Sequence, residues 1–190
     1  MSKDVNNPPA LVAQETGAWC FAAAEQMARA YFGLLPISQY EIAYNSLMGL
    51  VAAQAPPHFN QWNIASMADL LANITTNITP TQVAQSGQPP NPLSQRVALV
   101  RATYGAFNNV PFNGSISNVC TPGNFRADIE ANKIVVIGNA IHYYIVYGYD
   151  DRDGFVLKVR DPWPPGVGGQ ATTIDYDTFN AWASKVAIRF

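Results

Sequence analysis

The sequence is poor in charged residues and has no cluster of basic ones. Only 13% of its 190 residues are charged, and 11 Lys and Arg against 13 Asp and Glu give a net charge of −2. Such a chain lacks the positive surface that binds a phosphate backbone or anionic lipid. We therefore expect neither nucleic acid nor a membrane surface among its partners.

Long apolar runs are absent as well. The first nine residues contain no apolar segment of a signal peptide, and no later run approaches the roughly 18 residues of a membrane span. We expect a protein that stays in the cytoplasm or is exported by a route that needs no leader.

Cysteine and histidine are scarce, with two of each. Domains built on disulfides use more cysteines, so both are expected to be reduced. Neither Cys-x-x-Cys nor His-Glu-x-x-His occurs, which argues against a zinc site.

What the chain has is 48% hydrophobic residues at a length that suits a single domain. In its first 110 residues, apolar residues recur at helical spacing. Gly33 ends the first of these segments, which is apolar enough to be buried on most sides, and Ser38-x-x-Glu41 is a capping box that begins the next. Helices are expected over 19–32, 38–50, 64–71 and 97–104.

Residues 111–190 have the pattern of an antiparallel sheet. Thr121-Pro122 predicts a helix start, and a short helix near 176–184 is followed by a last strand. Strands are expected over 134–137, 141–149 and 155–161, the last two joined as a hairpin. The predicted fold class is α+β, a single domain with a helical lobe (1–110) packed on a β lobe (111–190).

Cys20 is placed at the start of the first helix. There the unpaired N–H groups and the positive end of the helix dipole favour a thiolate over a thiol. The alternative interpretation is a small buried apolar residue, the usual environment of a cysteine.

The hairpin predicts a partner for a nucleophilic cysteine. A turn centred between Asp151 and Arg152 pairs Gly148 with Phe155, and the same register puts His142 opposite Asp161. The carboxylate would then fix which ring nitrogen faces the thiol. A hydrogen-bonded core histidine is the alternative, and a slip of one residue would turn it to the other face.

His58 and Cys120 are the competing candidates. His58 lies in a Pro-rich segment without an evident carboxylate partner, so a surface histidine is the better interpretation. Cys120 has no histidine or acid at a suggestive spacing, which favours structural burial.

Three motifs resemble those of the papain-like cysteine peptidases, especially the compact bacterial ones that include bacteriocin-processing peptidases and effector proteases of plant pathogens. They are Gln14-x5-Cys20, His142-x5-Gly148 and Asp161-x-Trp163, in the family's order.

The resemblance implies a papain-like fold and a role for each residue. Cys20, His142 and Asp161 would form the catalytic triad. The Gln14 amide and the Cys20 N–H would form the oxyanion hole, and Trp163 would shield the third triad member.

Some features depart from the family pattern. Phe21 replaces the tryptophan that usually follows the nucleophile, and Asp161 replaces the asparagine of papain itself. Only 13 residues precede Gln14, too few for the long inhibitory propeptide of secreted papains.

The function implied is that of a monomeric cysteine peptidase that forms a thioester with a protein or peptide substrate and needs no cofactor. A related acyl-transfer enzyme (isopeptidase, deamidase or transglutaminase-like) and a catalytically silent binding module are the alternatives. The loops at 50–62 and 164–170 would determine the substrate.

Overall fold

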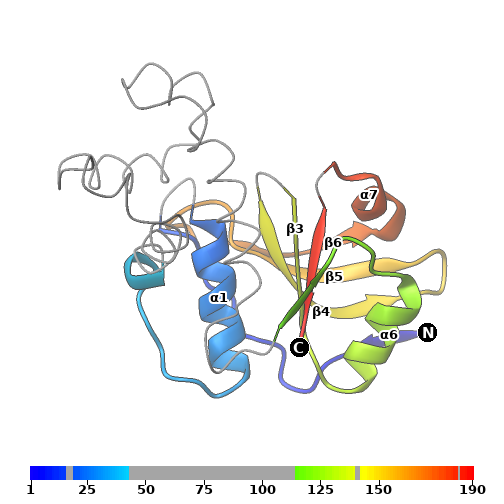
Figure 1. The fold of residues 1–190 in the computed structure, drawn as a ribbon, viewed down its shortest axis with the longest axis horizontal. Coiled ribbons are helices and arrows are strands. Elements are labelled where there is room, and N and C mark those ends of the chain that lie inside the picture. Colours follow the sequence, from blue (N-terminus) through cyan, green and yellow to red (C-terminus); the bar gives the residue numbers. More distant parts are fainter. Residues whose placement is uncertain (16–18, 43–113, 140–141, 184) are drawn as a thin grey trace, which may run out of the picture.

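The computed structural model describes residues 1–15, 19–42, 114–139, 142–183 and 185–190. These residues form an α+β structure, which confirms the predicted class. In Figure 1, α1 lies to one side of the sheet, and α6 and α7 lie toward the other. The elements are β1 (Ser2–Asp4), α1 (Cys20–Tyr31), β2 (Ser115–Ser117), α6 (Pro122–Glu130), β3 (Val135–Gly138), β4 (Tyr143–Asp150), β5 (Val156–Asp161), β6 (Gln170–Asp175), α7 (Tyr176–Ala181) and β7 (Val186–Arg189).

The strands of the described residues form one sheet in the order β2-β7-β3-β4-β5-β6, with every pair antiparallel. β3 pairs with Tyr143–Val146 of β4, and β1 pairs with Gly148–Asp150 further along the same edge. The antiparallel sheet predicted for the second half is confirmed. β1 was not predicted, and it adds a strand from the start of the chain to this sheet.

Helix α1 begins and ends near the predicted positions. Its C-terminus is a Schellman motif, in which the Leu34 N–H donates to the Arg29 carbonyl at 2.9 Å and the Gly33 N–H to the Ala30 carbonyl at 3.2 Å. Gly33 has φ +67°, a conformation that glycine adopts without steric cost. The helix is buried on most of its surface, as predicted.

A second helical segment starts at residue 39 and is described as far as residue 42. The Ser38 hydroxyl accepts a hydrogen bond from the Glu41 N–H at 3.0 Å, so this helix start is where the capping box predicted it. The rest of that helix, the helices predicted over 64–71 and 97–104, His58 and the loop at 50–62 lie outside the described residues.

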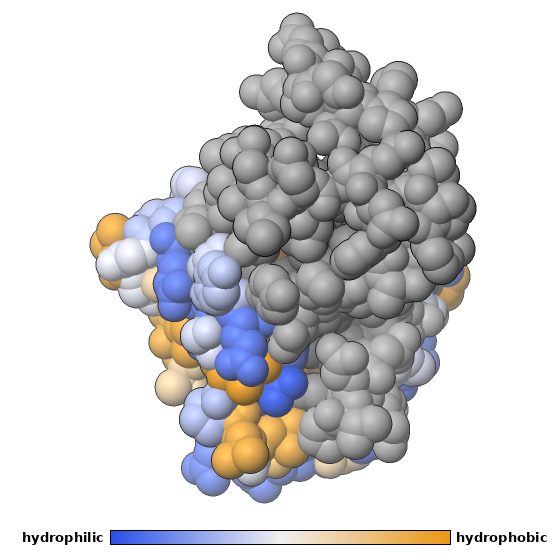
Figure 2. Space-filling view, turned by 60° about the vertical axis from the view of Figure 1, so that its left-hand side comes forward, coloured by the Kyte–Doolittle hydropathy of each residue, from blue (hydrophilic) through white to orange (hydrophobic). Residues whose placement is uncertain are grey.

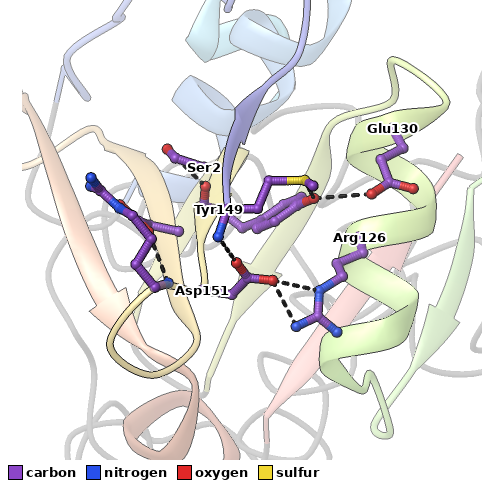
Figure 3. Close-up of polar contacts among 8 residues, drawn as sticks. Ser2, Arg126, Glu130, Tyr149 and Asp151 are labelled. Atoms are coloured by element: carbon purple, nitrogen blue, oxygen red, sulfur yellow. Dashed lines mark hydrogen bonds and ion pairs between the residues drawn. The ribbon is translucent and has the colours of Figure 1, made fainter.

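Helix α6 is joined to the far end of β4 by polar side chains. The Tyr149 hydroxyl donates to Glu130 Oε1 at 3.0 Å, and Arg126 Nε donates to Asp151 Oδ2 at 3.0 Å (Figure 3). The Ser2 hydroxyl of β1 donates to the Tyr149 carbonyl at 3.4 Å in the same cluster. These contacts stabilise the end of the sheet at which β1 was added.

The predicted register of the β4–β5 hairpin is wrong. Val146 pairs with Val159 and, after a bulge at Tyr147, Gly148 pairs with Lys158, so His142 and Asp161 are not direct cross-strand partners. The extra residue reverses the faces of β4 from that point on. The connection between the strands has the predicted five residues but lies one position later, because β4 ends at Asp150 and β5 begins at Val156.

The core lies between α1, α6 and the sheet, and the strands β3, β4, β5 and β7 contribute most of its aliphatic side chains. On the face drawn in Figure 2, apolar residues form separate patches among polar ones. Among the helices of the described residues, none is long and apolar enough to span a bilayer.

Candidate active site

Cys20 is the first residue of α1, and its sulfur is not part of a disulfide. The residue is 2% exposed. A helix N-terminus has N–H groups without intrahelical acceptors, and its dipole is positive, so a thiolate at this position is stabilised. The residue stands where the helix can supply both effects.

His142 directly precedes β4 and is fixed there by Asn139, which directly follows β3. The His142 N–H donates to Asn139 Oδ1 at 3.0 Å, and the Asn139 N–H donates to the His142 carbonyl at 3.0 Å. The sequence analysis missed Asn139. An asparagine three residues before a candidate histidine, between two predicted strands, was the available signal.

Asp161, the last residue of β5, holds the imidazole ring from one side. Its Oδ1 lies 2.7 Å from His142 Nε2 and also accepts a hydrogen bond from the Trp163 N–H at 2.9 Å. With Nε2 on the carboxylate, Nδ1 is the ring nitrogen left for Cys20, whose side chain is hydrogen-bonded to His142. The carboxylate thus determines which ring nitrogen is left to face the thiol, although not from a directly opposed strand position.

The pKa of His142 reflects this pairing. Burial alone would lower the pKa, but hydrogen bonds to Asp161 and Cys20 and the charges of both outweigh it and raise the pKa to about 9. The imidazole is therefore protonated at neutral pH. An imidazolium next to a cysteine favours the thiolate, so the pair suits nucleophilic chemistry.

The ring in contact with the imidazole is Tyr144. Its centroid lies 4.5 Å from that of His142 in an edge-to-face arrangement, and Trp182 stacks on its other side at 5.7 Å. Burial, together with the charges of Asp161 and Cys20, raises the pKa of Tyr144 to about 12. Trp163, expected to shield the triad, is 48% exposed and contacts Asp161 through its backbone N–H.

Gln14 is fully buried and is attached to the loop that follows Asp161. The Gln14 N–H donates to the Pro162 carbonyl at 3.0 Å, and its own carbonyl accepts from the Gly166 N–H at 3.0 Å. Gly169 ends this loop just before β6 with φ +62°, and a Cβ there would collide with the Asp161 carbonyl. The predicted oxyanion residue and the predicted acid are therefore joined by one short loop.

The structure thus brings Cys20, His142 and Asp161 into one hydrogen-bonded series and attaches Gln14 to the loop beside it. Cys120, the second cysteine, lies elsewhere, near the Asp128–Arg189 ion pair. Burial, with smaller effects of those two charges, raises the pKa of Cys120 to about 12, so this thiol is not ionised at neutral pH.

Within the part of the chain that the structure describes, no group of three or more His, Cys, Asp or Glu side chains is arranged to hold a metal ion. In the comparisons with known proteins, no family model matches the sequence and no curated protein is significantly similar to it.

Proposed function

We propose that the chain is a papain-like cysteine peptidase that hydrolyses peptide bonds through Cys20, His142 and Asp161. The observation that carries the proposal is the hydrogen-bonded series from the thiol at the start of α1, through the imidazole, to the carboxylate at the end of β5. A helix-borne thiol set against an antiparallel sheet that carries the base and the acid is also the arrangement of the papain-like fold.

The reaction begins with the thiolate of Cys20 and the imidazolium of His142. The sulfur attacks the carbonyl carbon of the scissile bond, and a C–S bond forms while the carbonyl oxygen takes the negative charge. His142 then donates its proton to the departing amine, the C–N bond breaks, and a thioester remains. His142 then takes a proton from water, the hydroxide attacks the thioester carbonyl, the C–S bond breaks, and the carboxylic acid leaves while the thiolate and the imidazolium are restored.

Asp161 keeps the imidazole in the orientation that this cycle needs. Its bond to Nε2 directs Nδ1 to the sulfur, and its charge stabilises the imidazolium. The oxyanion would be met by the Cys20 N–H at the start of the helix and by the side-chain amide of Gln14, whose backbone is held by Pro162 and Gly166.

A second candidate follows from the same acyl-enzyme. If the thioester reacts with an amine instead of water, the protein is a transferase, and if the leaving group is a side-chain amine or ammonia, it is an isopeptidase or a deamidase. The triad geometry is common to all of these reactions, so product identification separates them.

The test is incubation with a peptide-like electrophile that alkylates active-site thiols, followed by peptide mapping. We expect one adduct, on Cys20, and none on the His142→Ala variant under the same conditions. Peptide libraries and isopeptide-linked substrates, analysed by mass spectrometry, then identify the reaction. A wild-type protein that forms no adduct and changes no substrate would contradict the proposal and favour a binding module.

A further inference from the structure

Gln39 contacts the backbone on both sides of Gln14. Its side-chain Oε1 accepts a hydrogen bond from the Glu15 N–H at 2.8 Å, and its Nε2 donates to the Ala13 carbonyl at 2.8 Å. Gln39 is 1% exposed. A buried amide needs hydrogen-bond partners, and this one finds two of them on a single three-residue segment.

The opposite edge of segment 13–15 is held by main chain. Gln14 bonds to Pro162 through its N–H and to Gly166 through its carbonyl. Successive residues of an extended chain direct their polar groups to alternate edges, which matches the partners found here. The Gln39 amide therefore stands where a peptide group of a neighbouring strand would stand in a sheet.

Gln39 is itself fixed to the helix that carries the thiol. Its Nε2 also donates to Oε1 of Gln26 at 3.0 Å, and Gln26 Nε2 donates to the Ile37 carbonyl at 2.7 Å. Gln26 belongs to α1. Two glutamine side chains thus connect the helix that begins at Cys20 to the segment that carries Gln14.

We propose that Gln39 is a positioning residue for the oxyanion hole, holding the backbone of segment 13–15 so that the Gln14 amide keeps its place relative to Cys20. The inference rests on the proposed function, because it requires Gln14 to meet the oxyanion. A donor must lie about 2.7–3.1 Å from the position of the oxyanion to stabilise that charge, and a misplacement of about 1 Å costs on the order of 10²-fold in rate.

The test compares two reactions of Cys20. A p-nitrophenyl ester acylates the thiol: the C–S bond forms, the C–O bond breaks, nitrophenolate leaves, and the carbonyl oxygen carries the charge in between. Iodoacetamide alkylates the same sulfur with loss of iodide and forms no oxyanion. We expect Gln39→Met to slow acylation by roughly 10-fold to 10²-fold and to leave alkylation unchanged.

A double-mutant cycle shows whether Gln39 acts through Gln14. We expect Gln39→Met to slow acylation in the wild-type background and to have little further effect in the Gln14→Ala background. Equal fold losses in both backgrounds would overturn the proposal. Gln39→Glu, which retains an oxygen for the Glu15 N–H, provides the same cycle should the methionine variant not fold.

Tyr149→Phe is the control for stability. It removes a partly buried hydrogen bond at the far end of the sheet, to Glu130. We expect it to lower the melting temperature as a Gln39 variant does, with no loss of acylation. An equal loss of acylation in the control would show that general destabilisation explains the effect.

Amide hydrogen exchange separates this inference from the proposed function. The Glu15 amide should exchange faster in Gln39→Met than in the wild type, whether or not the protein is an enzyme. Unchanged exchange at Glu15 would overturn the role of Gln39. A wild-type Cys20 that is alkylated but never acylated would contradict the proposed function and, with it, the catalytic consequence of the positioning.

Discussion

Cys20 and Cys120 are buried to the same extent, 2% exposed each, yet their surroundings differ in every other respect. Cys20 begins a twelve-residue helix and is hydrogen-bonded to a protonated imidazole. Cys120 precedes a helix capped by Thr121, and its burial raises its pKa to about 12. Burial alone therefore does not determine what a cysteine can do. The charged and polar groups around the sulfur do.

Replacement of each cysteine gives the largest expected difference. Cys20→Ala should reduce turnover by roughly 10⁶-fold, the effect of removing a nucleophile whose partners act as one unit. Cys120→Ala should leave turnover unchanged and cost about 1 kcal/mol of unfolding free energy, because it removes only a buried sulfur. Steady-state assays and urea denaturation measure the two effects. Loss of turnover in both variants would mean that the reaction requires Cys120 as well as Cys20.

The rates at which the Cys20 and Cys120 thiols are alkylated test the same difference, and they need no substrate. At pH 7 a thiol with a pKa of about 12 is ionised to only about 10⁻⁵. Brief treatment with iodoacetamide should therefore label Cys20 at least 10²-fold faster than Cys120. Peptide mapping over a time course gives both rates. Since the exposed fractions are equal, similar rates would mean that Cys20 is not held as a thiolate.

Asp161 tests whether the Cys20 site depends on orientation or on charge. Asp161→Asn keeps an oxygen for His142 Nε2 and should cost about 10-fold in kcat, while Asp161→Ala should cost about 10²-fold or more. Loss of the carboxylate charge should also change the pH–rate profile: the fall in rate that accompanies deprotonation of the imidazolium should occur at lower pH. Equal inactivity of both variants, with the fold intact by circular dichroism, would assign the essential role to the charge.

The free energy of unfolding should fall in two separate ranges as the pH rises. The pKa of His142 is about 9 in the folded protein, whereas its ordinary value is 6.5. Its contribution to the free energy of unfolding is therefore complete below pH 6.5 and is lost as the pH rises to 9. The loss should approach about 3 kcal/mol. Cys120 should add a second loss between pH 9 and 12, where its thiol remains protonated only in the fold.

Urea denaturation across this pH range measures both losses. His142→Gln should remove the first and retain the second, and Cys120→Ala should do the reverse. A single loss that persists in both variants would assign the pH dependence to other groups.

The parts of the site that the sequence predicted are those encoded by short spacings. The Gln14-x5-Cys20 motif and the strand patterns at His142 and Asp161 are local, and the structure brings the last three of these residues together. Alternation also placed His142 and Asp161 on one face correctly, because the bulge lies beyond both of them.

The features that were not predicted depend on contacts between residues far apart in the sequence, which no local pattern indicates. The register was wrong because the turn is centred on Asp153 and not between Asp151 and Arg152, and because the bulge at Tyr147 adds a residue that only the neighbouring Gly148 marks. Gln39 bonds to backbone atoms 24 and 26 residues away, and any buried carboxamide would look the same in the sequence. The short strands β1 and β2 are defined mainly by their partners, since three residues are too few for a period to be recognised.

The bulge at Tyr147 also limits how the length of this strand can change during evolution. It lets Val146 and Tyr149, three positions apart, lie on the same side of the sheet as Val159 and Leu157. Deletion of Tyr147 itself would leave a regular ladder, because Val146 and Gly148 would then lie in succession opposite Val159 and Lys158. Once the bulge is gone, a further deletion in β4 would either turn Tyr149 away from Glu130 or move His142 away from Asp161. Gaps within this strand should therefore fall at the bulge among homologous chains, whereas gaps in the turn at 151–155 leave both ends of the strand in phase.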